Sequence, residues 1–178
     1  MLTYDMAVNE TITVFSEKLQ KPSIITKIDQ NAIIQWSHWK TAENAEPRQK
    51  PNGGYDWAKL REMYYHKKPY YFAPERRIDI AIWCEGQLCG LALGGVSKQY
   101  DYIVLDYIEG SSVCTHPLKG HVLDITFFMV TQYAMIENID EIRLVDPVNN
   151  LIPYYQSIGF ELVSIRKQKP YCFRKVHQ

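Results

Sequence analysis

The fold of this chain is constrained most by three consecutive β-forming segments. One long apolar helix pattern and a further short strand pattern follow them. The β-formers lie in 78–86, 87–97 and 102–113 and predict consecutive antiparallel strands. Apolar residues recur at helical spacing over 121–139, and 141–145 then has the pattern of a strand. Because a helix separates the last two strands, they can pair in parallel, and diverging parallel strands leave a ligand crevice at their carboxyl ends.

The segments before this region predict one strand and two helices. The strand is predicted at 23–29, and the helices at 32–43 and 56–66, where Asp29 and Asp56 stand in the N-cap positions. A strand is therefore expected to open the fold.

The segments after this region predict a short helix at 150–159 and a closing pair of strands within 160–176, with a turn near Lys169 and Pro170. A polar loop is predicted at 46–55. The predicted order is β-α-α-β-β-β-α-β-α-β-β. This is an α/β fold of the α+β kind, in which helices flank a mixed, mostly antiparallel central sheet.

Length and composition favour a single domain over residues 1–178. Hydrophobic residues make up 46% and charged residues 22% of the chain, which excludes a disordered chain or a coiled-coil rod. Twenty basic and twenty acidic residues cancel, so no overall field attracts nucleic acid or an anionic membrane. The start of the chain lacks a signal-peptide pattern, and no run of about 18 apolar residues occurs. We therefore expect a cytoplasmic protein with no membrane partner.

Cysteine and histidine spacing predicts no metal site. The cysteines lack C-x-x-C spacing and are predicted to be small core residues: Cys84, Cys89, Cys114 and Cys172. His38, His66 and His116 are too dispersed for a zinc centre.

The segment that leads into the long helix is a candidate anion site. It spans 113–122 and combines Lys119, Gly120 and the first N–H groups of the helix. Backbone amides, a helix dipole and a lysine suit a phosphate or pyrophosphate. Pro-x-x-Gly before a helix is also ordinary turn chemistry, so this loop alone does not decide the function.

The end of the short helix is a second candidate. Gly159 is expected to end the helix in a left-handed conformation, and Phe160 to return to the core. Tyr155, one turn earlier, then points its phenol toward the crevice. For a single tyrosine, a half-buried ring with a satisfied hydroxyl is the alternative.

Together these segments resemble the GNAT superfamily of acetyl-coenzyme A-dependent acyltransferases. The resemblance covers the order and type of elements over nearly the whole chain and is sharpest from Ile78 to Phe160. A strand leads through a Pro/Gly loop into a long helix, and an Asn precedes a Tyr-x-x-x-Gly-Phe ending. The ending is carried by Asn149 or Asn150, Tyr155, Gly159 and Phe160.

The resemblance implies that acetyl-CoA is the co-substrate and that its acetyl group passes directly to a primary amine in a ternary complex. Pantetheine would pair like an extra strand beside 108–113, and the loop amides would receive the pyrophosphate. Tyr155 matches the general acid that protonates the departing thiolate. The implied cofactor-binding residues are Ser111, Ser112, Val113, Leu118, Lys119, Gly120, His121, Val122 and Asn150.

The phosphate loop departs from the family pattern, which is roughly Gln/Arg-x-x-Gly-x-Gly/Ala. Residues 116–121 are spaced differently, lack the leading Arg or Gln, and end in His121, whose bulk replaces a residue that lets backbone approach phosphate. Either Lys119 and a histidine supply the charge, or the fold is kept without catalysis.

A base for the attacking amine is predicted on the strand at 102–113. Glu109 lies near its end, where the family often places its base, and period-two alternation puts Asp106 on the opposite face. The amides of 111–113 would polarise the thioester carbonyl, and a bulge near Gly110 and Ser111 would help to expose them.

Two histidines offer alternatives. His116 and His121 could act as base or bind phosphate. A triad of Ser111, Ser112 or Cys114 with His116 is disfavoured because no nucleophile elbow is present.

Local charge predicts a cationic acceptor. The stretch 101–141 carries seven acidic residues and one lysine. In GNAT folds the second helix region borders the acceptor site, so the predicted substrate-binding residues are Trp57, Tyr64, Tyr65 and Asp106. The stretch 59–77 combines six basic residues with aromatic rings, which suits RNA or a nucleotide as well as a solvated helix face over core aromatics.

The resemblance, together with the residues, leads to three hypotheses. The first is an N-acetyltransferase acting on a primary amine of a small molecule, a peptide or protein, or a charged tRNA. The second is a GNAT-fold module that binds acyl-CoA or a protein partner without turnover. The third is a toxin- or phage-type acetyltransferase that modifies aminoacyl-tRNA or a host protein. The C-terminal strand at 171–173 could pair with a second copy, so a homodimer is possible.

Overall fold

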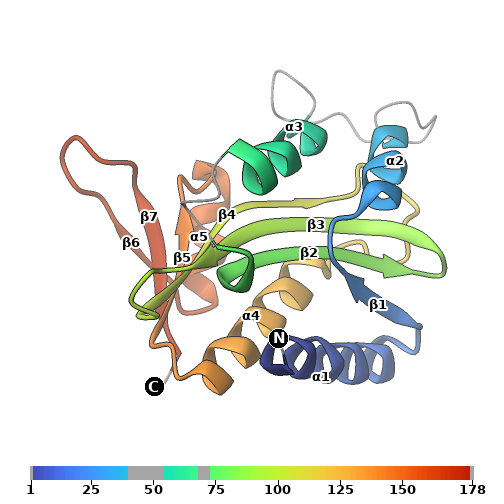
Figure 1. Ribbon diagram of the computed structural model, residues 1–178, viewed down its shortest axis with the longest axis horizontal. Helices are drawn as coiled ribbons and strands as arrows, with labels where there is room; N and C mark the ends of the chain where they lie inside the picture. Colours follow the sequence, from blue (N-terminus) through green and yellow to red (C-terminus); the bar gives the residue numbers. More distant parts are fainter. Residues whose placement is uncertain (1, 40–53, 68–72, 177–178) are drawn as a thin grey trace.

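One sheet of seven strands runs through the molecule, and Figure 1 shows helices on both of its faces. The computed structural model describes residues 2–39, 54–67 and 73–176. The strands are β1 (Ser23–Thr26), β2 (Arg77–Cys84), β3 (Gln87–Val96), β4 (Tyr102–Gly110), β5 (Glu141–Val145), β6 (Glu161–Val163) and β7 (Tyr171–Lys175). They lie in the order β1-β2-β3-β4-β5-β7-β6, with β4 and β5 parallel and every other neighbouring pair antiparallel.

Two helical layers cover the sheet. The α-helices are α1 (Leu2–Leu19), α2 (Gln30–His38), α3 (Trp57–Glu62), α4 (Val122–Glu137) and α5 (Ile152–Ser157). Three short turns complete them: the π-helical turn η1 (Met63–Lys67) and the 3-10 turns η2 (Pro74–Arg76) and η3 (Asn149–Leu151). Helices α1 and α4 share one core with one face of the sheet, and α2 and α3 share a second core with the other face. None of the helices in the described ranges is long and apolar enough to cross a membrane.

The predicted class and the central order of elements are confirmed. Strands β2, β3 and β4, helix α4 and strand β5 lie where the sequence placed them, and β4 pairs with β5 in parallel. Both predicted N-caps form, because the Asp29 carboxylate accepts from the Ala32 amide at 2.8 Å and the Asp56 carboxylate from the Lys59 amide at 3.1 Å. Three of the four cysteines are buried, and Cys114 is half-buried.

The expectation that a strand opens the fold is wrong, because α1 precedes β1. Ala7, Thr11 and Phe15 are buried at four-residue spacing and form the face that packs on the core. Phe15 meets Phe128 of α4 edge to face, with ring centroids 5.6 Å apart. Polar residues such as Asn9, Glu10 and Thr13 lie between these positions and interrupt the apolar pattern in the sequence.

Two boundaries differ from the prediction. Helix α2 ends at His38, and the rest of its predicted range, 40–43, lies outside the described residues, as does most of the predicted loop 46–55. The β6–β7 hairpin turns at 166–168, where Lys167 adopts a positive φ of 68°, and not near Pro170.

Strand β4 contains a bulge at Asp106. Leu93 of β3 pairs with Tyr107 and Gly94 pairs with Leu105, which leaves Asp106 as an extra residue. A Cβ on Gly94 would overlap the carbonyl oxygen of Val104. Only glycine fits opposite the bulge, so this close approach of the two backbones depends on Gly94.

Replacing Gly94 by alanine should therefore destabilise the protein by about 3 kcal/mol, because the added methyl must displace backbone. Gly110→Ala is the matched control, since its Cβ would meet only Val122, at 3.7 Å. Urea unfolding measures both variants. Equal free energies of unfolding would show that the close approach at Gly94 does not constrain the fold.

A buried carboxylate joins the N-terminal elements to the sheet. Asp79 of β2 is 3% exposed and accepts hydrogen bonds from the Ile28 amide at 2.7 Å and from the Tyr65 hydroxyl. The Tyr4 hydroxyl of α1 donates to the Asp79 carbonyl at 2.9 Å. Burial raises the pKa of Asp79 to about 6.

The protein should lose stability relative to Asp79→Asn as pH rises from 4 to 7. The folded protein binds the Asp79 proton more tightly than the unfolded chain, whose aspartates titrate near the ordinary pKa of 3.8. The resulting stabilisation is complete below pH 3.8 and is lost as pH rises through about 6. We expect a relative loss of about 2 kcal/mol. Urea unfolding of both proteins across this range measures it, and a constant difference would contradict the titration.

Candidate active site

A crevice opens where β4 and β5 part. The two strands pair only from Tyr102 to Leu105, opposite Glu141 to Leu144. Beyond Leu105, β4 runs on to Gly110 along a cavity of about 750 Å³, whose other walls are the loop after β4, the start of α4, the end of β5 and helix α5. The sequence predicted a crevice at the carboxyl ends of these two strands, and the cavity lies there.

The bulge brings two carboxylates to the same side of β4. Glu109 accepts hydrogen bonds from the Trp57 indole and, at 3.4 Å, from the Tyr55 amide, while Asp106 accepts one from the Tyr64 hydroxyl. All three donors belong to α3 and the segments next to it. The expected opposite faces for Asp106 and Glu109 are therefore wrong, because the extra residue at 106 shifts the alternation. The bulge also lies earlier in β4 than the predicted Gly110–Ser111.

Trp57 and Tyr64 hold these carboxylates from behind. Trp57 is completely buried and Tyr64 is 7% exposed, and neither is among the residues that line the cavity. Burial and the nearby Asp106 carboxylate raise the pKa of Tyr64, so its hydroxyl keeps its proton and donates it in a hydrogen bond. The sequence predicted both as substrate-binding residues, and in the structure each of them donates a hydrogen bond to one of the two carboxylates.

Tyr65 lies away from the cavity, although it too was predicted to bind substrate. Its hydroxyl donates to Asp79. The guanidinium groups of Arg61 and Arg77 lie 4.9 and 4.0 Å from the centre of its ring. Tyr64 and Tyr65, which are neighbours in η1, thus donate hydrogen bonds to two different carboxylates.

Tyr155 lines the cavity from α5. Its ring packs against Phe127 and Phe160, each 6.2 Å away between centroids, and the residue is 6% exposed. The helix ends as predicted, with Gly159 at a φ of 88° and the Phe160 amide donating to the Tyr155 carbonyl at 3.0 Å. Burial raises the pKa of Tyr155 to about 12, so the phenol stays protonated at neutral pH.

Several backbone amides between Ser111 and His121 are engaged within the protein. Ser111 donates to the Cys89 carbonyl at 2.8 Å and Val113 to the Ser111 hydroxyl at 3.2 Å. Lys119 and His121 donate to the carbonyls of His116 and Leu118, at 3.2 and 3.0 Å. These bonds shape the turn before α4 and occupy amides that the sequence analysis assigned to the thioester and the pyrophosphate.

Most of the predicted site residues nevertheless lie around one cavity. Those that line it are Asp106, Glu109, Ser111, Ser112, Val113, Lys119, Gly120, Val122, Asn150 and Tyr155. Leu118 is instead completely buried in the core. His121 precedes α4, and its Nδ1 lies 3.9 Å from Asp124 Oδ2.

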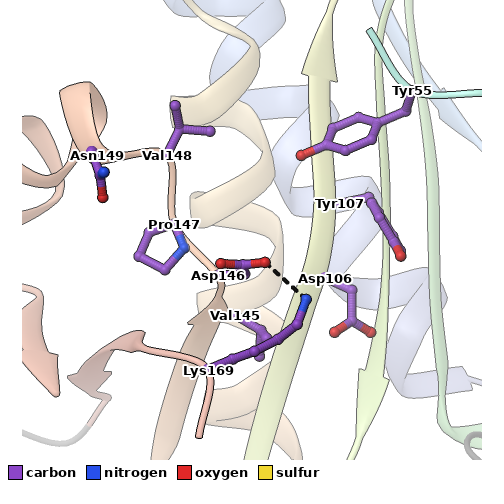
Figure 2. Close-up of a pocket in the computed structure, with 9 residues that line it drawn as sticks. All are labelled: Tyr55, Asp106, Tyr107, Val145, Asp146, Pro147, Val148, Asn149 and Lys169. Atoms are coloured by element: carbon purple, nitrogen blue, oxygen red, sulfur yellow. Dashed lines mark hydrogen bonds and ion pairs between the residues drawn. The ribbon is translucent and has the colours of Figure 1, made fainter. Parts of the chain in front are cut away.

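Four polar or aromatic residues at the outer end of the crevice, shown in Figure 2, were not predicted from the sequence: Tyr55, Tyr107, Asp146 and Lys169. Asp146 could have been found, because it directly follows β5 and the carboxyl ends of parallel strands share one edge. Lys169 could not, since the β6–β7 hairpin brings it there from a distant part of the sequence. Among the described residues, no three His, Cys, Asp or Glu side chains gather as metal ligands.

Solved structures share this fold. No family model matches the chain, and no curated protein matches its sequence. The ribosomal-protein-S18-alanine N-acetyltransferase from Escherichia coli aligns with a TM-score of 0.56 at 13% identity, over 88% of this chain and 95% of that one. The PaiA N-acetyltransferase from Thermoplasma acidophilum, in complex with coenzyme A, aligns with a TM-score of 0.57 at 14% identity, over 86% of this chain and 98% of that one.

A variant of the SpeG spermidine N-acetyltransferase from Vibrio cholerae aligns with a TM-score of 0.56 at 15% identity, over 86% of this chain and 94% of that one. At such identities the likeness concerns the fold. The chain has the fold of the GNAT N-acetyltransferases.

Proposed function

We propose that this protein is an N-acetyltransferase that transfers the acetyl group of acetyl-CoA directly to a primary amine in a ternary complex. The observation that carries the proposal is the crevice between β4 and β5, with Glu109 on its β4 wall and Tyr155 on its α5 wall. A carboxylate that can take a proton and a phenol that can give one face the same cavity.

The cavity fits an extended co-substrate with phosphates at one end. Beyond Leu105 the edge of β4 faces the cavity and not β5, which leaves room for a pantetheine arm beside 108–113. A Cβ on Gly120 would meet no atom within 4 Å, so the backbone there is open to an approaching phosphate. Lys119 and the first amides of α4 supply positive charge at this end, and Asn150 lies on the opposite wall. Acetyl-CoA supplies the acetyl thioester.

Glu109 is assigned the role of base. An amine attacks as the neutral free base, so the ammonium must lose a proton first. The indole of Trp57 and the Tyr55 amide donate to Glu109 Oε2 and fix the carboxylate at the cavity wall. Glu109 can then take the proton directly or through one water.

Tyr155 is assigned the role of acid. Its pKa of about 12 keeps a proton on the hydroxyl throughout the physiological range. The packing of its ring against Phe127 and Phe160 holds the phenol in place. The hydroxyl can therefore donate to the sulfur as negative charge develops there.

Tyr155→Phe should lower kcat by about 100-fold and leave the affinity for acetyl-CoA unchanged, because the ring remains and only the donor is lost. Thiol release measures turnover with a panel of amines, and calorimetry measures binding. Tyr133→Phe is the control, since Tyr133 is also buried with a pKa raised to about 12 but does not line the cavity. Unchanged turnover in Tyr155→Phe would remove Tyr155 from the mechanism.

Trp57→Phe should lower kcat about tenfold with little change in the KM for acetyl-CoA, because Glu109 loses the indole donor. The acidic limb of the kcat/KM profile should move to higher pH, since the lost bond favoured the ionised carboxylate. Trp83→Phe is the matched control, because its indole is also buried on this side of the sheet but donates to Thr26 at 3.0 Å. Identical pH profiles in both variants would contradict the role of Trp57.

A module that binds acyl-CoA or a protein without turnover is the second candidate. The backbone amides of Lys119 and His121 favour this candidate. Both donate hydrogen bonds to carbonyls within the protein, so the loop has two fewer donors for a phosphate. The experiments above separate the candidates. Binding of acetyl-CoA without transfer to any amine would identify a module, and binding with transfer would identify the enzyme.

A further inference from the structure

The outer end of the crevice forms a compartment of its own. Its volume is about 400 Å³, and it lies between the bulged part of β4 and the end of β5 with the segment 146–149 that follows it (Figure 2). The rings of Tyr55 and Tyr107 line it on one side, with centroids 5.1 Å apart, and the carboxylates of Asp106 and Asp146 face it. Carboxylates and aromatic rings are the groups that bind alkylammonium ions.

The protein itself places an ammonium group in this compartment. The side chain of Lys169 reaches in from the β6–β7 hairpin, and its Nζ lies 2.8 Å from Asp146 Oδ2 (Figure 2). The hydrogen bond and charge of Asp146 raise the pKa of Lys169, and the Asp106 carboxylate adds to this effect. The compartment thus already binds a primary alkylammonium.

This bound lysine can be displaced at small cost. The side chains of Lys169 and Asp146 are 72% and 57% exposed, and ion pairs with this exposure contribute little to stability. The backbone beside them is fixed, because the Asp146 amide donates to the Pro170 carbonyl at 2.9 Å. A competing ammonium therefore needs to move only the flexible lysine side chain.

The charge of the crevice leaves a place for a second cation. Glu109, Asp106 and Asp146 line it, Lys169 pairs with Asp146, and Lys119 lines the crevice outside this compartment. If Glu109 serves the reacting amine, as in the proposed function, Asp106 and Asp146 remain beyond it toward the outer end.

We propose that the compartment between Tyr107 and Asp146 binds the second ammonium group of a diamine-type acceptor in place of the side chain of Lys169. This assignment rests on the proposed function, because it extends the acceptor half of the same crevice. Lys169 then acts as a competitor that sets the affinity for doubly charged amines.

The test compares diamines with monoamines of the same carbon number. Diaminobutane, diaminopentane and diaminohexane, with butylamine, pentylamine and hexylamine, are titrated by calorimetry into the full chain in the presence of coenzyme A at fixed ionic strength. Lys169→Met should bind diamines about fivefold more tightly, because the competitor is gone. Asp146→Asn should lower the preference for diamines over monoamines about fivefold. Lys167→Met is the control, since it removes the same charge from the exposed turn of this hairpin and should bind as the wild type does.

The outcomes separate the two proposals, because acetyl transfer to the same amines is measured in parallel. Diamine affinity that rises in Lys169→Met, falls in Asp146→Asn and is unchanged in Lys167→Met supports the subsite, even if no amine is acetylated and the proposed function fails. Acetyl transfer with equal diamine preference in all four proteins overturns the subsite and leaves the proposed function intact. A rise in Lys167→Met equal to that in Lys169→Met would show a general charge effect and also overturn the subsite.

Discussion

Pairing between β4 and β5 ends at Leu105, and the extra residue Asp106 enters β4 directly after it. A bulge bends its strand and increases the local twist, so β4 turns away from β5 at the point where their hydrogen bonds stop. The crevice, the exposed edge of β4 and the positions of both carboxylates follow from this departure. The bulge in turn needs Gly94, because no other residue lets β3 approach the Val104 carbonyl so closely.

The bulge also places two carboxylates where they lose solvation, and side chains of the helical segments compensate for this loss with hydrogen bonds. It turns Asp106 and Glu109 toward the aromatic layer of α3, where a carboxylate without donors would lose much of its solvation. Trp57 and Tyr64 supply one strong donor each, and neither carries a charge that would compete with a ligand. The π-helical turn Met63–Lys67 changes the spacing of side chains after α3, so that consecutive tyrosines reach Asp106 and Asp79.

Local patterns were sufficient to predict the central part of the fold. Alternation, caps and helical spacing identified β2 to β5 and α4, because those signals lie within each segment. The position of the bulge was predicted wrongly because it depends on the partner strand. One extra residue reverses the face of the sheet to which the side chains after it point. The aromatic character of Trp57 and Tyr64 marked them as functional, but only the folded chain shows that their partners are carboxylates. Lys169 belongs to the crevice through a tertiary arrangement that no local motif encodes, because the β6–β7 hairpin carries it there.

The two ends of the crevice differ in charge, and this difference orders the two substrates of the proposed reaction. Lys119 and the amino end of α4 lie at one end, while Asp106, Glu109 and Asp146 lie at the other. Asp124 in the first turn of α4 would weaken the attraction for phosphate, but its Oδ1 accepts from the Tyr154 hydroxyl at 2.9 Å and its Oδ2 faces His121. An anionic co-substrate and a cationic acceptor therefore each have one favourable orientation. In the proposed reaction, that orientation would bring their reactive ends together between Glu109 and Tyr155.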